Sequence, residues 1–163
     1  MTTIAVTGHM DLTDDSVPLV RAALDDLLRQ HAGDGQLVGV SCIAKGSDSL
    51  FAEAVLAAGG RLTVVIPSQD YRRNKVKPDH AALFDHLVEA ADETLTLPHE
   101  TASRQAYEAA NTVLIERADR LVAVWNGQPP TGKGGGTADT VLEARAAGIP
   151  VDVVWPEGAA RRG

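Results

Sequence analysis

The chain has 163 residues, of which 44% are hydrophobic and 23% are charged, and its formal net charge at pH 7 is -7. This length and composition predict one globular domain with a core of its own. The acidic balance argues against nucleic acid as a partner, because nonspecific binding requires many Lys and Arg side chains to neutralise phosphates.

Short runs of almost continuous apolar residues recur along the chain. They lie at residues 4–6, 37–40, 62–66, 121–125 and 151–155, and a weaker, alternating run lies at 94–97. Continuous apolar runs are typical of strands that are covered on both faces, as in parallel sheets. We therefore expect about six strands in a mainly parallel sheet.

Stretches with helical periodicity separate these runs, at about residues 16–31, 50–58, 81–90, 107–118 and 138–147. Ser16 and Pro18 suit the start of the first stretch, and Gly148 suits the end of the last one. Alternating strands and helices predict a three-layer α/β/α, Rossmann-like sandwich. We expect a single domain over residues 1–156, followed by a short polar tail at 157–163.

No apolar run approaches the length that a membrane span requires, and Cys42 is the single cysteine. One cysteine cannot form an intramolecular disulfide, which suits a reducing compartment. We expect a cytoplasmic protein with no membrane association.

Ligands of open parallel sheets bind beyond the carboxyl ends of the strands, so the loops after the strands are the first place to search. Glycine-containing loops follow three of the strands, at residues 7–9, 44–48 and 125–140. Glycines let backbone N–H groups approach an anion, and a helix N-terminus adds positive charge. A single loop of this kind equally fits a flexible turn that caps a helix, but three loops at one edge favour a binding site.

The polar side chains of these loops allow two interpretations each. His9 could exchange protons, but we favour a loop histidine that only forms hydrogen bonds. Asp48 and Asp139 could bind a ribose hydroxyl, or could simply be stabilised in the first turn of a helix. The basic segment 72–77 could fold over an anion or be solvated. His80, His86 and His99 lack metal-ligand spacing, so we expect no metal site and no cofactor.

The order of these motifs resembles the SLOG superfamily, which includes YpsA-type proteins, DprA and the lonely-guy (LOG) phosphoribohydrolases, and we place the chain in the YpsA-related branch. The matching motifs are Thr7-Gly8-His9, Lys45 to Leu50 with Ala52, Ala118-Asp119, Val124 to Gly127, and Gly135-Gly136-Thr137. The resemblance spans about residues 3–155. It implies the strand order 3-2-1-4-5-6 and a nucleotide or nucleotide-derived ligand over the glycine loops.

The catalytic positions of the LOG enzymes can be matched to residues of this chain. An Arg-Lys pair that LOG enzymes carry falls on Ala110 and Asn111, and their two loop glutamates fall on Asp139 and Thr140. The catalytic arginine is therefore missing, at most one acid remains, and the loop carries the insertion 128–131. Cleavage of an N-glycosidic bond depends on positioned carboxylates, so binding survives these changes more easily than catalysis.

We therefore expect a nucleotide-binding protein, a sensor or carrier rather than an enzyme. Asn111 could donate and accept hydrogen bonds with the ligand, or could equally bond a neighbouring loop. The expected ligand-binding residues are Gly8, His9, Gly46, Ser47, Asp48, Asn111, Gly134, Gly135, Gly136, Thr137 and Asp139. The first alternative is a LOG-like nucleoside 5′-monophosphate phosphoribohydrolase that uses Asp139 in place of the glutamate of those enzymes. The second is a non-catalytic assembly domain. The helix pairing of related folds implies a homodimer.

Overall fold

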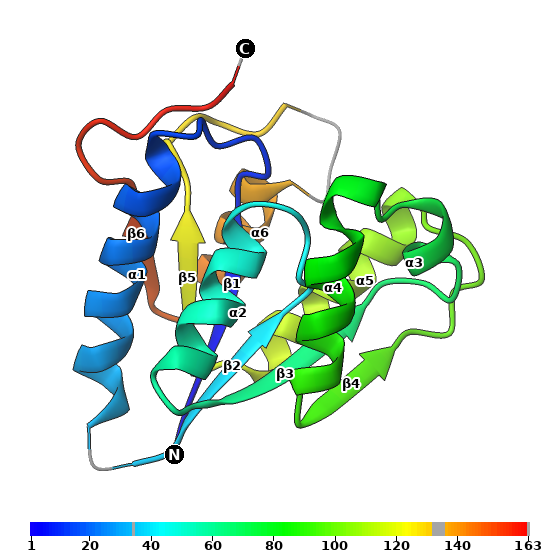
Figure 1. Ribbon diagram of the computed structural model, residues 1–163, viewed down its shortest axis with the longest axis horizontal. Coiled ribbons are helices and arrows are strands. Elements are labelled where there is room, and N and C mark those ends of the chain that lie inside the picture. Colours follow the sequence, from blue (N-terminus) through cyan, green and yellow to red (C-terminus); the bar gives the residue numbers. More distant parts are fainter. Residues whose placement is uncertain (34, 132–135, 163) are drawn as a thin grey trace.

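A computed structural model describes residues 1–33, 35–131 and 136–162, which form alternating strands and helices (Figure 1). The described strands form one six-stranded sheet, and every neighbouring pair is parallel. The strands are β1 (Thr2–Gly8), β2 (Leu37–Ser41), β3 (Arg61–Ile66), β4 (Glu93–Thr96), β5 (Arg120–Val124) and β6 (Val151–Val154).

The strand order is β4-β3-β2-β1-β5-β6. From β1, the strands β2, β3 and β4 follow toward one edge of the sheet, and β5 and β6 follow toward the other. This arrangement confirms the type of strand order that the resemblance implied. The weak apolar run at 94–97 forms the short edge strand β4, where most residues are exposed. Edge strands bury less surface, which explains the weaker pattern in this part of the sequence.

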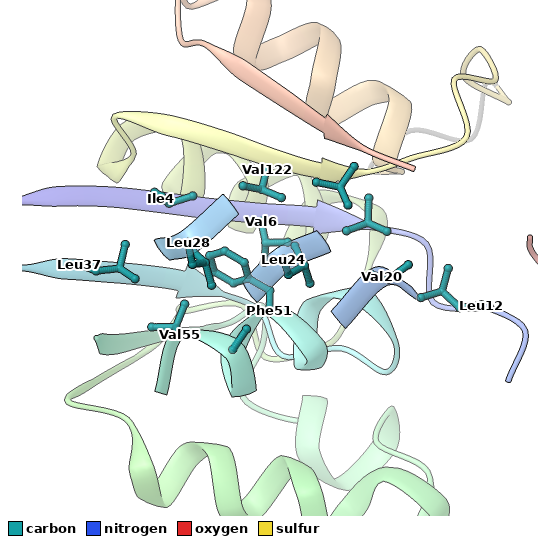
Figure 2. Packing of buried hydrophobic residues seen from close by; sticks show 13 residues of the cluster. Ile4, Val6, Leu12, Val20, Leu24, Leu28, Leu37, Phe51, Val55 and Val122 are labelled. Atoms are coloured by element: carbon teal, nitrogen blue, oxygen red, sulfur yellow. The ribbon is translucent and has the colours of Figure 1, made fainter. Parts of the chain in front are cut away.

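The inner strands are apolar almost throughout because helices cover both faces of the sheet. In β1, Ile4 and Val6 join one core cluster, whereas Ala5 between them joins another on the opposite face. Figure 2 shows the first cluster, in which Phe51 packs among side chains from β1 and the neighbouring helix. Successive side chains of a strand point to opposite faces, so a strand buried on both sides needs no polar residues.

The helices are α1 (Ser16–Ala32), α2 (Ser47–Ala57), α3 (Tyr71–Asn74), α4 (Pro78–Ala90), α5 (Arg104–Arg117) and α6 (Thr137–Ala146). Buried residues of α1, α2 and α4 pack on one face, and those of α5 and α6 pack on the other. This arrangement confirms the predicted three-layer sandwich. No described helix is long and apolar enough to cross a membrane.

Two segments have structure that the sequence did not indicate. Residues 71–74, at the start of the basic segment, form the single helical turn α3. Asp70 holds this turn, because its carboxylate accepts hydrogen bonds from Ser68 Oγ at 2.7 Å, Asn74 Nδ2 at 3.0 Å and the Ala102 backbone N–H at 2.8 Å. The polar tail, in turn, folds back onto the loop between β1 and α1, where Leu12 and Arg161 form an antiparallel bridge.

Candidate functional site

A cavity of about 590 Å³ opens at the carboxyl edge of the sheet. The carboxyl ends of the central strands point upward in Figure 1. The walls of the cavity come from the loops after β1, β2, β3 and β5, from one side of α5 and from the first turn of α6. β1 and β5 are neighbours at the point where the strand order reverses. Crevices at such points are the usual ligand sites of open α/β sheets, and this volume is within the range of ligand pockets.

The structure brings most of the expected binding residues to this cavity. Its lining includes Gly8, His9, Asp48, Asn111, Gly136, Thr137 and Asp139. Gly46 and Ser47 do not line it, and Gly134 and Gly135 lie outside the described residues. The three loops therefore converge as expected, although not every residue of each loop faces the cavity.

Gly8, Gly46 and Ser47 bring the end of β1 against the start of α2. A Cβ atom on Gly8 would lie 2.5 Å from Ser47 Cβ, and Gly46 has a left-handed φ of +88°. Ser47 Oγ donates a hydrogen bond to the backbone oxygen of His9 at 2.7 Å. Ser47 therefore uses its hydroxyl within the protein, and Gly46 and Ser47 support the lining residues Gly8 and His9 from outside the cavity.

His9 joins the two central loops. It is 7% exposed, its Nε2 accepts a hydrogen bond from the backbone N–H of Asn126 at 3.1 Å, and its ring packs edge-on against Trp155 with centroids 5.6 Å apart. Burial, and then the positive charge of Arg161, lower the pKa of His9 below the ordinary histidine value. A neutral ring that accepts at Nε2 agrees with the non-catalytic interpretation of this residue.

Asp48 lies at the start of α2 and lines the cavity. Together with Asn111 it forms the polar part of the lining that we call the floor. Asp48 is partly buried, and burial raises its pKa to about 7 in spite of a hydrogen bond from the backbone of Ala44. Burial also raises the pKa of Cys42 and of Tyr71, and the Asp48 charge adds to both shifts. The lining thus contains one carboxyl group with a pKa raised to about 7, together with Cys42 and Tyr71, whose raised pKa values keep them neutral.

The chain reverses after β2 through Ile43, a buried β-branched residue with a φ of 47°. Its N–H donates to Ser41 Oγ at 2.9 Å, and its carbonyl lies 2.9 Å from His80 Nε2. A left-handed conformation is costly for isoleucine, so these contacts must hold it in place. Its neighbours Cys42 and Ala44 both line the cavity. Local sequence preferences oppose this turn, so no sequence pattern predicted it.

The first turn of α6 forms another wall. Asp139 Oδ2 accepts a hydrogen bond from the Gly136 N–H at 3.2 Å, and Thr140 Oγ1 donates to the Gly136 carbonyl at 3.0 Å. Asp139 therefore caps its own helix, which agrees with the structural interpretation of this carboxylate. The remaining N–H groups of a first helical turn have no partner within the helix, and Thr137 and Ala138 supply them beside the cavity.

Several cavity-lining residues were not assigned to a site from the sequence. Lys75 belongs to the basic segment, Tyr107 to the apolar stripe of α5, and Arg161 to the polar tail. Arg72 of the same basic segment instead forms an exposed ion pair with Asp85. The local charge of the segment could have indicated Lys75, but nothing in the tail distinguishes Arg161. No cluster of three or more His, Cys, Asp or Glu residues in the described ranges could hold a metal ion.

No family model matches the chain, and no curated protein matches it. Solved structures do match. DprA from Streptococcus pneumoniae superposes with a TM-score of 0.70 at 20% identity over 97% of this chain and 52% of that protein. DprA from Helicobacter pylori gives 0.67 at 16% identity, covering 98% and 68%. The Moco carrier protein of Chlamydomonas rheinhardtii gives 0.53 at 19% identity, covering 93% and 74%.

These similarities define an open, parallel, Rossmann-like α/β protein whose candidate site lies at the switch point of the sheet. The chain shares its fold with DprA and with the Moco carrier protein, so the fold that the resemblance implied is confirmed. The chain spans about half of the length of the Streptococcus pneumoniae DprA.

One expectation is wrong. The acidic net charge does not exclude nucleic acid, because DprA from Helicobacter pylori shares this fold and binds single-stranded DNA. Net charge averages over the whole surface, whereas single-stranded nucleic acid is held by local basic grooves and stacking side chains. A chain with a net charge of -7 can still carry such a local surface.

Proposed function

We propose that the switch-point cavity binds a nucleotide or a nucleotide-derived metabolite. The observation that carries this proposal is the combination, around one cavity, of the first turn of α6 with the polar floor of Asp48 and Asn111. Backbone N–H groups at a helix N-terminus suit a phosphate. The carboxyl and amide groups of the floor suit hydroxyl or ring-nitrogen partners. A carrier or sensor role requires no more than these contacts.

The aromatic wall supports a planar group on the ligand. Tyr107 lines the cavity, and its ring packs edge-on against Tyr71 with centroids 6.3 Å apart. Burial raises the pKa of both phenols, so they stay neutral. A neutral aromatic side chain beside a polar floor is the kind of surface on which a nucleobase stacks.

The competing proposal is a LOG-like phosphoribohydrolase in which Asp139 acts as the catalytic acid. The hydrogen bond from Gly136 N–H to Asp139 favours the binding protein, since it engages this carboxylate as a helix cap. Ala110, at the position of the missing arginine, adds only a methyl group to the cavity wall. Release of free base from a nucleoside 5′-monophosphate, abolished by Asp139→Asn, would establish the enzyme instead.

A thermal-shift screen tests the proposal. The panel contains nucleoside mono-, di- and triphosphates, cyclic and dinucleotides, the corresponding neutral nucleosides, and a single-stranded oligonucleotide. A ligand at a hundredfold excess over its Kd adds about 2.7 kcal/mol, which corresponds to several degrees in Tm. A well-folded protein that responds to no member of the panel would contradict nucleotide binding. The assembly-domain alternative would then remain, and light scattering would test the expected homodimer.

A further inference from the structure

The tail that follows β6 is fixed to the mouth of the cavity by backbone and side-chain hydrogen bonds. Thr13 N–H donates to the Ala160 carbonyl at 3.1 Å, and Arg162 N–H donates to the Asp11 carbonyl at 2.7 Å. Ala160 N–H donates to the buried Ser16 Oγ at 2.8 Å. Residues 160–162 thus lie antiparallel to residues 11–13, so the position of Arg161 is set by the backbone.

The two arginines of the tail face different cavities. Arg161 lines the switch-point cavity, whereas Arg162 lines a second cavity of about 460 Å³ among α1, α2 and α4. Successive residues of an extended segment point to opposite sides, which explains this division. Each arginine also has its own carboxylate partner, Asp11 for Arg161 and Asp14 for Arg162. The tail therefore forms two similar ion pairs: Arg161–Asp11 at the candidate site and Arg162–Asp14 away from it.

The Arg161–Asp11 pair is accessible to a ligand. The two groups are 2.7 Å apart, their side chains are 43% and 38% exposed, and both line the cavity. Arg161 lowers the pKa of Asp11 and of His9, so its guanidinium acts on the interior of the site. Exposed pairs of this kind contribute little stability, and a phosphate accepts the same paired hydrogen bonds from arginine as a carboxylate does. A phosphate can therefore replace Asp11 at small cost.

Few side chains of the cavity lining could bind a phosphate by their charge. Among the residues that the structure describes, Lys75 and Arg161 are the cationic side chains of the lining. Asp139 is engaged in capping α6. Arg161 lies between Ala160 and Arg162, whose backbones are hydrogen-bonded to the loop that follows β1, and its side chain is already held at the cavity by Asp11. Its ordering when a ligand binds therefore costs little.

We propose that Arg161 is the phosphate-binding side chain of the cavity and that Asp11 is its built-in competitor, which an incoming phosphate group displaces. The inference rests on the proposed function of the cavity and specifies how an anionic ligand is held there. It assigns a binding role to the tail, and it predicts the unusual result that removing a carboxylate from the site tightens binding.

Pyrophosphate is the probe, titrated into the full chain at low salt while NMR follows the Arg161 Nε–H resonance. We expect a saturable shift of this resonance in the wild type. Arg161→Gln should weaken pyrophosphate binding about tenfold, and Asp11→Asn should tighten it several-fold. Arg162→Gln and Asp14→Asn are the matched controls and should leave the Kd within about twofold.

The proposal is overturned if the Arg161 resonance does not saturate, if Asp11→Asn fails to tighten binding, or if Arg161→Gln behaves like Arg162→Gln. The wild-type resonance gives this answer even if a variant folds poorly. A nucleotide that binds the wild type and Arg161→Gln equally would overturn the role of Arg161 and leave the proposed function standing. Pyrophosphate binding through Arg161, with no response to any nucleotide, would support the role of Arg161 and contradict the proposed function.

Discussion

His9 Nε2 accepts a hydrogen bond from the backbone N–H of Asn126 at 3.1 Å, although 117 residues separate the two along the chain. This contact ties the end of β1 to the loop after β5, on either side of the point where the strand order reverses. The histidine that the sequence offers as a proton donor is thus occupied in shaping the cavity. We therefore expect substitution of His9 to change the free energy of unfolding.

We expect His9→Ala to lower the free energy of unfolding by about 1 to 3 kcal/mol, because it leaves the Asn126 N–H without its acceptor and removes the packing on Trp155. Urea denaturation measures the change, with the exposed His86→Ala as the control. The lowered pKa of His9 also means that wild-type stability falls as the pH drops below about 6.5, the ordinary value. Equal losses for the two variants would contradict this role.

Asp48 should show the opposite pH dependence. Its pKa is about 7 in the folded protein, against an ordinary 3.8, so its contribution to stability is complete below pH 3.8 and is lost as the pH rises through 7. Relative to Asp48→Asn, the wild type should lose up to about 1.4 kcal/mol per pH unit within that window. Denaturation curves at several pH values measure this difference.

Asp85→Asn provides the control for Asp48, because the neighbouring Arg72 lowers the pKa of Asp85. The stability that Asp85 adds is present above its ordinary pKa and is lost as the pH falls. The two variants should therefore differ from the wild type with opposite slopes. A flat difference between wild type and Asp48→Asn would show that the floor of the cavity is better solvated than its burial indicates.

Gly8→Ala should destabilise the protein by about 1 to 3 kcal/mol, since the added Cβ would lie 2.5 Å from Ser47 Cβ and 2.8 Å from Val124 Cβ. Both neighbours belong to packed elements that cannot move apart freely. Gly35→Ala is the control, because its nearest contact would be an ordinary 3.6 Å. Thermal unfolding should give a clearly lower Tm for the first variant and a nearly unchanged Tm for the second.

Thr137→Pro tests whether the backbone of α6 binds phosphate. Proline suits the first position of a helix, and the extended backbone of Gly136 before it (φ -83°, ψ 177°) is compatible with a following proline. The variant removes one N–H group and keeps the helix. We expect about tenfold weaker binding of whichever nucleotide responds in the thermal-shift screen. Thr137→Ala keeps the N–H and should bind normally; equal affinities for both variants would place the phosphate elsewhere.

The sequence by itself determined the class of fold and the edge of the sheet at which to look for a site. Apolar runs and helical stripes are local patterns, so they predicted the sandwich, and parallel strands necessarily bring their following loops to one edge. The same loops identified several of the cavity-lining residues, including Asp48 and Thr137. The SLOG resemblance rested on the order of those loops.

Tertiary structure alone decided what each residue does there. Ser47 faces inward to the His9 carbonyl, Asp139 caps its helix, and burial moves the pKa of Asp48 to about 7. Arg161 reaches Asp11 across 150 residues of chain. Solvation and long-range hydrogen bonds depend on which surfaces meet after folding, and no local pattern of residues records that. The tail, which is only a short polar segment in the sequence, therefore contributes Arg161 to the lining of the cavity.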